Sequence, residues 1–134
     1  MNYKNHRAYT IKSLIQVTGD GLVEVGGLEF KTSPAALIPR PETEELIFLV
    51  DKSNVVKESE ANVLDIGTGT GIIPISLKSR NKNWNIFGLD ISLNALKLAK
   101  ENATKNNVEI EFIHTSIFDY SPTLKFDIII TSNR

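Results

Sequence analysis

The chain has 134 residues and a formal net charge of −1, so it is long enough for one domain and has no basic excess that would indicate nucleic-acid binding. It contains no cysteine, which excludes disulfides, thiolate metal sites and a cysteine nucleophile. Neither of its two histidines, His6 and His114, has acidic neighbours at metal-ligand spacing, so we expect no metal site. No apolar stretch approaches the roughly 20 residues that span a bilayer, and the N-terminus leads into no signal-peptide core. We therefore expect a cytoplasmic protein that does not cross a membrane.

Residues 1–36 are predicted to form an N-terminal segment that contains a β-hairpin. Apolar and polar residues alternate over 22–25 and 28–31, on either side of Gly26-Gly27, which is typical of a two-residue hairpin turn. A helix is expected from Pro41, because the fixed φ of proline suits a first helical turn and acids follow it there. The apolar residues of this helix are expected to face a core: Leu46, Ile47, Leu49 and Val50. A polar linker follows over residues 51–61.

From residue 63 onwards, apolar runs alternate with amphipathic segments. Strands are predicted over residues 63–66, 84–89, 109–114 and 126–130, and helices over 72–79 and 92–105. Ser92 is a good N-cap for the second helix. The buried stripe of that helix is expected to consist of Leu93, Leu96, Leu98 and Ala99. Strands that are apolar on both faces and alternate with helices predict a parallel, doubly wound α/β sheet, so residues 37–134 are interpreted as a partial Rossmann-like domain.

A glycine-rich turn after the first of these strands indicates a site for a nucleotide-like cofactor. The strand ends at Asp65 and leads into Gly67-Thr68-Gly69-Thr70-Gly71, where glycine permits positive φ values and lets backbone N–H groups approach a ligand. About 20 residues later the next strand ends at Asp90, whose carboxylate is placed to accept hydrogen bonds from two ribose hydroxyls. Ile72 stands where a dinucleotide fingerprint has its third glycine, and Asp65 suits a cationic ligand better than a pyrophosphate. A NAD-binding module is therefore the weaker alternative.

The glycine turn resembles motif I of S-adenosylmethionine-dependent methyltransferases, and two further segments narrow the resemblance. The sequences L-I-P-R-P-E-T-E at 37–44, V-L-D-I-G-T-G-T-G-I-I at 63–73 and F-D-I-I-I at 126–130 closely resemble HemK-type methyltransferases. Those enzymes methylate N5 of the glutamine in the Gly-Gly-Gln loop of peptide-chain release factors. The resemblance runs from about residue 22 to 133. It implies the Rossmann-like fold of S-adenosylmethionine-dependent methyltransferases, with its first four strands present after a β-hairpin, and a release factor as the protein substrate.

The resemblance also implies roles for individual residues. The glycine turn would cradle the methionine moiety of the cofactor above Asp65, Asp90 would hold the ribose, and Ile117 would pack on the adenine. Asp119 lies three positions after Ser116, which aligns with an acid of the family, and it is either an adenine contact or a turn former. Arg40 would lie on the substrate side of the active site. The cofactor-binding residues would be Asp65, Gly67, Thr68, Gly69, Thr70, Gly71, Asp90, Ile91, Ile117 and Asn133.

The catalytic element of the HemK family is Asn-Pro-Pro-Tyr at the end of the fourth strand. Its asparagine and a proline carbonyl accept hydrogen bonds from the glutamine NH₂ group and orient the nitrogen toward the sulfonium methyl. Asn133 matches the asparagine, and Arg134 follows it in place of the first proline. We expect a form truncated at both ends, which either associates through the exposed strand 126–130 or is a fragment of a longer protein. Two alternatives stay open: an N6-adenine-type amino-methyltransferase of DNA or RNA, and a non-catalytic S-adenosylmethionine-binding or interaction fragment.

Overall fold

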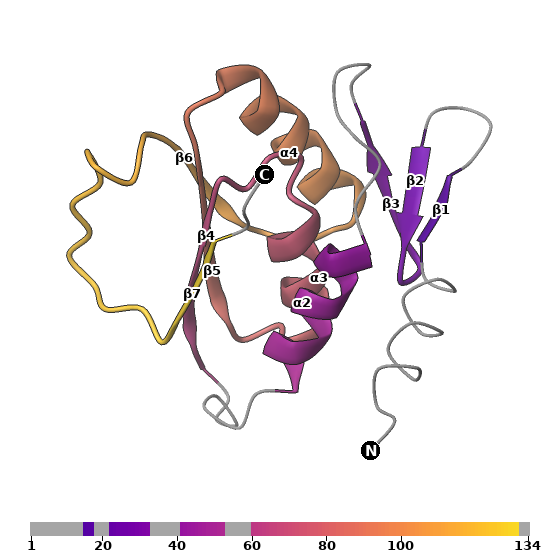
Figure 1. Cartoon of the computed structure of the whole chain (residues 1–134), viewed down its shortest axis with the longest axis horizontal. Coiled ribbons are helices and arrows are strands. Elements are labelled where there is room, and N and C mark those ends of the chain that lie inside the picture. The colour runs from indigo at the N-terminus through magenta and orange to yellow at the C-terminus, as the bar shows by residue number, and fades with distance from the viewer. Residues whose placement is uncertain (1–14, 18–21, 33–40, 53–59, 132–134) are drawn as a thin grey trace.

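The computed structural model describes residues 15–17, 22–32, 41–52 and 60–131, which form two sheets and the helices between them (Figure 1). The smaller sheet is antiparallel, with strands β1 (Ile15–Val17), β2 (Leu22–Val25) and β3 (Leu28–Lys31) in that order. The larger sheet has the order β6-β5-β4-β7, and all its neighbouring strands are parallel. Its strands are β4 (Asn62–Ile66), β5 (Asn85–Asp90), β6 (Glu111–His114) and β7 (Ile128–Thr131). The predicted parallel α/β sheet and the hairpin before it are confirmed.

The strand order of the parallel sheet reverses at β4. The chain runs outward from β4 to β5 and β6 and then returns to pair β7 with the other side of β4. In open α/β sheets, ligands bind outside the carboxyl ends of the strands at such a switch point. The glycine turn begins at the carboxyl end of β4, so the topology places it where a ligand is expected.

Three helices occupy the layer between the two sheets: α2 (Pro41–Asp51), α3 (Ile72–Arg80) and α4 (Leu93–Lys105) (Figure 1). Ser92 caps α4, because its side chain accepts a hydrogen bond from the N–H group of Ala95 at 3.1 Å. The described helices lie on one face of the parallel sheet, whereas a doubly wound sheet has helices on both. On β5, Phe87 packs edge-on against Phe126 from the loop before β7, with ring centroids 5.4 Å apart. No described helix is long and apolar enough to cross a membrane.

The hairpin packs its apolar residues onto the helices. Its turn has φ values of 56° at Gly26 and 86° at Gly27, which suit the tight two-residue connection that the sequence predicts. Val23, Val25 and Phe30 are buried and belong to the same core as the residues of the parallel sheet. Strand β1 adds a third strand, which the sequence analysis did not predict, beside β2.

Two residues expected in the core are exposed. Leu49 is 44 % exposed, because α2 presents its neighbour Ile47 to the core instead, with Leu46 and Val50 partly buried beside it. Leu93 is 63 % exposed, since it opens α4 beyond the carboxyl end of the sheet. The predicted domain boundary after residue 36 and most of the predicted linker lie outside the described residues, and both stay predictions.

Candidate functional site

Most backbone N–H groups of the glycine turn, residues 67–71, donate hydrogen bonds to acceptors within the chain. Gly67, Gly69 and Gly71 have φ values of 73°, 59° and 86°, in the left-handed region that glycine adopts readily. The N–H groups of Gly67 and Thr68 both donate to the carbonyl of Leu89 at 2.9 Å, and that of Gly71 donates to the carbonyl of Thr68 at 3.0 Å. The N–H group of Gly69 donates to Oδ2 of Asp90 at 2.8 Å. Four of the five turn residues therefore direct their backbone N–H groups to acceptors within the chain.

Asp65 of β4 is hydrogen-bonded to this turn. Its side chain is fully buried, and Oδ2 accepts a hydrogen bond of 2.7 Å from the hydroxyl of Thr68, which is itself buried. A methyl group added at Gly88 on the neighbouring strand would lie 2.8 Å from that hydroxyl oxygen, so β5 needs a glycine beside Thr68. Asp65 and Thr68 thus hold the shape of the turn, and a direct contact of either residue with a ligand stays a prediction.

Asp90 joins the turn to the end of β5 and retains acceptor capacity. Oδ2 accepts from Gly69, and Oδ1 accepts from the N–H group of Ser92 at 2.9 Å. An ionised carboxylate has about four acceptor sites, so about two remain for a ligand. Asp90 is partly exposed, which keeps those sites within reach of a ligand. The remaining capacity matches a pair of hydroxyls such as those of a ribose.

Apolar side chains border the same edge of the sheet. Ile91 is 75 % exposed after β5, and Ile117 and Phe118 are 41 % and 94 % exposed in the loop after β6. The N–H group of Thr115 donates to the carbonyl of Asp90 at 3.1 Å and brings this loop beside the end of β5. Exposed apolar side chains at this edge are able to pack against the ring of an aromatic base.

Asp119 closes the loop after β6. Its N–H group donates to Oγ of Ser116 at 3.2 Å, and its Oδ2 accepts from the same hydroxyl at 3.0 Å. These reciprocal bonds agree with the turn-former interpretation of Asp119. An adenine contact by this carboxylate stays a prediction.

The structure thus gathers most of the predicted site at one edge of the parallel sheet. The glycine turn, Asp65, Asp90, Ile91 and Ile117 all lie at or just after the carboxyl ends of β4, β5 and β6. Arg40 and Asn133, the two residues assigned to the substrate side and to catalysis, lie outside the described residues. Their roles stay predictions.

Sequence reasoning missed one polar residue that reaches this site. Asn102 of α4 is fully buried, and its Nδ2 donates to the carbonyl of Thr70 at 2.9 Å. The available signal was an asparagine beside Ala99 and Ala103 on the buried stripe of an amphipathic helix. A polar side chain in such a stripe needs a buried partner, but the sequence does not say which one.

Comparison with known proteins identifies the family. The family model of the methyltransferase small domain matches residues 47–133, and the chain belongs to this family. The release factor glutamine methyltransferase of Lactococcus lactis is 43 % identical over 112 residues, which cover 84 % of this chain and 40 % of that protein. The protein of the same name from Streptococcus pneumoniae is 40 % identical, with 84 % of this chain and 39 % of that protein covered. The chain spans about two fifths of the length of these relatives. The resemblance to HemK-type methyltransferases is confirmed.

Solved structures agree with the fold. The ribosomal protein L11 methylase of Lactobacillus delbrueckii has a TM-score of 0.61 and 28 % identity, over 76 % of this chain and 51 % of that one. An S-adenosylmethionine-dependent methyltransferase from Agrobacterium tumefaciens has a TM-score of 0.62 at 20 % identity, over 82 % of this chain and 38 % of that one. The fold is therefore that of the S-adenosylmethionine-dependent methyltransferases.

Proposed function

We propose that this chain is the cofactor-binding part of an S-adenosylmethionine-dependent methyltransferase that modifies the glutamine of the Gly-Gly-Gln motif in a peptide-chain release factor. The observation that supports the cofactor class is the internal hydrogen bonding of the glycine turn. Its N–H groups at Gly67, Thr68, Gly69 and Gly71 are already bonded within the chain, so they are not available to a pyrophosphate. A nucleoside ligand without phosphate fits this turn better than NAD does.

The remaining groups of the site fit an adenosine. The spare acceptor sites of Asp90 match the two ribose hydroxyls, and the exposed side chains of Ile91 and Ile117 would pack against the adenine ring. S-adenosylmethionine, when bound, supplies a methyl group on a sulfonium and needs no phosphate site. The fit supports this cofactor on chemical grounds that are independent of the relatives' names.

The substrate class rests on the two relatives from Lactococcus lactis and Streptococcus pneumoniae, which are both named release factor glutamine methyltransferase. Asn133 would accept a hydrogen bond from the glutamine NH₂ group and orient its nitrogen, with Arg40 on the same side. Arg134 follows Asn133 where the HemK family has its first proline, so the amide would be oriented by Asn133 without a contact from that proline. Release factors act in the cytoplasm, where we expect the reaction to take place.

Calorimetric titration of this chain with S-adenosylhomocysteine, and separately with NADH, tests the cofactor class. Binding of S-adenosylhomocysteine alone is the expected result, and binding of NADH alone would contradict the proposal. Incubation with S-adenosylmethionine and a release factor, followed by mass spectrometry of the Gly-Gly-Gln peptide, then tests transfer. Cofactor binding without transfer would favour the non-catalytic alternative. Methylation of adenine in DNA or RNA would favour the amino-methyltransferase alternative over a protein substrate.

Self-association through residues 126–130 is a separate proposal. Strand β7 lies at one edge of the described sheet, and its Ile129 is 57 % exposed. An exposed apolar edge strand offers unpaired backbone groups to a second chain. Size-exclusion chromatography with light scattering should show a mass that rises with protein concentration, and a monomer at every concentration would contradict the proposal.

A further inference from the structure

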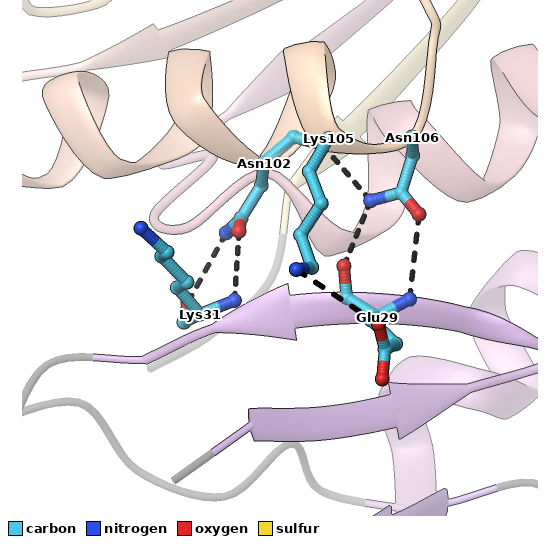
Figure 2. A network of polar contacts seen from close by, with 5 residues as sticks. All are labelled: Glu29, Lys31, Asn102, Lys105 and Asn106. Carbon is cyan, nitrogen blue, oxygen red and sulfur yellow. Dashed lines mark hydrogen bonds and ion pairs between the residues drawn. The ribbon is translucent and has the colours of Figure 1, made fainter. Parts of the chain in front are cut away.

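Asn102 of helix α4 and Asn106, the C-cap of that helix, bond to the outer edge of the hairpin sheet as a neighbouring strand would (Figure 2). Asn102 accepts from the N–H group of Lys31 at 2.7 Å and donates to the carbonyl of Lys31 at 3.1 Å. One helical turn later, Asn106 accepts from the N–H group of Glu29 at 3.3 Å and donates to its carbonyl at 2.8 Å. Each side-chain amide therefore satisfies both backbone groups of one β3 residue.

The spacing of the two asparagines explains this match. Alternate residues of an antiparallel edge strand direct their N–H and C=O groups away from the sheet, and Glu29 and Lys31 are two residues apart. Residues four apart on a helix lie above one another on one face, which places Asn102 and Asn106 at successive outward positions of β3. Lys105 and Glu29 add an ion pair of 3.8 Å at the surface, where such pairs contribute little.

Only one of the two asparagines also reaches the glycine turn. The second hydrogen of the Asn102 amide is donated to the carbonyl of Thr70 at 2.9 Å. The next N–H group, that of Gly71, donates to the carbonyl of Thr68, so the Thr70–Gly71 peptide is bonded at both ends. Asn102 is fully buried and makes three bonds, to β3 on one side and to the turn on the other.

Packing holds the same peptide against α4. A methyl group added at Gly71 would lie 3.3 Å from Cβ of Ala99, one turn before Ala103 on the helix that carries Asn102. Glycine at position 71 therefore lets the turn lie close against α4, with the Thr70 carbonyl within reach of Asn102. A displacement of Asn102 would break the hydrogen bond that joins the Thr70 carbonyl to α4.

We propose that Asn102 is a positioning residue that couples the docking of the β-hairpin to the shape of the cofactor turn. The inference rests on the proposed function, because it assigns S-adenosylmethionine or S-adenosylhomocysteine to that turn. Asn102 does not need to touch the cofactor. It holds the Thr70–Gly71 peptide in the orientation that the ligand meets, and its own amide plane is held by Lys31. Coupling of this kind is reciprocal, so cofactor binding also strengthens the attachment of β3 to α4.

A pair of matched substitutions tests the coupling. Asn102→Asp keeps the acceptor for Lys31 but removes both donated bonds and places a carboxylate beside two carbonyl oxygens. Asn106→Asp makes the same change at the C-cap of α4, where the side chain bonds to β3 but not to the glycine turn. The readouts are amide hydrogen exchange at Gly71 without ligand and the Kd for S-adenosylhomocysteine, both at a temperature where the variants are folded.

The coupling predicts unequal effects. Asn102→Asp should speed exchange at Gly71 and raise the Kd by about 10-fold or more, whereas Asn106→Asp should change both by less than about 2-fold. Equal effects of the two substitutions would overturn the proposal, since they would show that both asparagines only anchor the hairpin. If the wild-type chain does not bind S-adenosylhomocysteine, the proposed function fails, and exchange at Gly71 still decides the coupling.

A second pair leaves α4 unchanged and serves if Asn102→Asp does not fold. Lys31→Pro removes the N–H group that bonds to Asn102, and Glu29→Pro removes the one that bonds to Asn106. Proline is tolerated on edge strands where the lost N–H points outward. Faster exchange at Gly71 in Lys31→Pro than in Glu29→Pro supports the coupling, and equal exchange at Gly71 in the two variants overturns it.

Discussion

The hairpin turn and the cofactor turn both depend on glycines with positive φ, but their surroundings differ. In the hairpin, Gly27 has a φ of 86°, and a methyl group added there would meet no atom within 4 Å. In the cofactor turn, Gly71 has the same φ, but an added methyl group would lie 3.0 Å from Cδ1 of Ile75 and 3.3 Å from Cβ of Ala99. The hairpin needs glycine for its backbone conformation alone, whereas the cofactor turn needs it for conformation and for space.

Alanine at each position should separate these two requirements. Gly27→Ala should lower the free energy of unfolding by about 1 kcal/mol, the cost of a left-handed conformation for a residue with a side chain. Gly71→Ala adds overpacking against α3 and α4 and should cost about 3 kcal/mol in total. Urea unfolding of both variants measures the difference. Equal losses would show that the close contacts around Gly71 relax at no cost.

Substitution of Asp90 tests whether the cofactor turn binds a ligand. Asp90→Ala removes the proposed ribose acceptor and the bond to Gly69, so the affinity for S-adenosylhomocysteine should fall at least about 10-fold, or about 1.4 kcal/mol. Asp119→Ala is the control, because its carboxylate bonds to Ser116 within its own loop. Calorimetry measures both variants. A loss of affinity in Asp119→Ala alone would contradict the ribose contact of Asp90 and would favour the adenine contact of Asp119.

Both turns could be predicted from the sequence because their signals are local. Glycine spacing determines the backbone conformation within a few residues, and Asp90 is recognisable because an acid ends an apolar strand. The burial of Asn102 could not be predicted in the same way, since it depends on β3 lying against α4, 71 positions away along the chain. Leu49 and Leu93 were wrongly expected in the core for a related reason. A helical pattern shows that one face is apolar, but not which apolar residue the neighbouring elements cover.

The hydrogen bond from Thr68 to Asp65 predicts a smaller effect on stability. Thr68→Val keeps the shape of the side chain and removes the hydroxyl that donates to the buried carboxylate of Asp65. Loss of that donor should lower the free energy of unfolding by about 1–2 kcal/mol. Thr68→Ser retains the hydroxyl and is the control, with a smaller loss from the missing methyl group. If the valine and serine variants were equally stable in urea, the hydroxyl bond would contribute nothing to the turn.

A second buried acid, Glu44, lies near the hairpin turn, on the first turn of α2. It lies with Gly26, Ser76 and Arg80 around a small polar cavity, and it is only 4 % exposed. Within the described ranges, no group hydrogen-bonds to Oε1 of Glu44. Burial raises the pKa of this carboxyl above its ordinary value of 4.5, and the charge of Arg80 opposes the shift only in part. Glu44 therefore differs from Asp65, whose carboxylate receives a hydroxyl hydrogen bond.

The sign of this shift predicts how stability depends on pH. A carboxyl with a raised pKa in the folded state stabilises the fold fully below its unfolded pKa, and this contribution is lost as the pH rises through the folded pKa. Glu44→Gln stays uncharged, so its melting temperature should exceed that of the wild type near pH 7, by the equivalent of less than about 1 kcal/mol. The gain should shrink as the pH is lowered toward 4.5. Glu45→Gln, one residue along α2, is the control for a lost carboxylate. If the difference in melting temperature between Glu44→Gln and wild type stayed constant with pH, ionisation of Glu44 would not affect the stability of the fold.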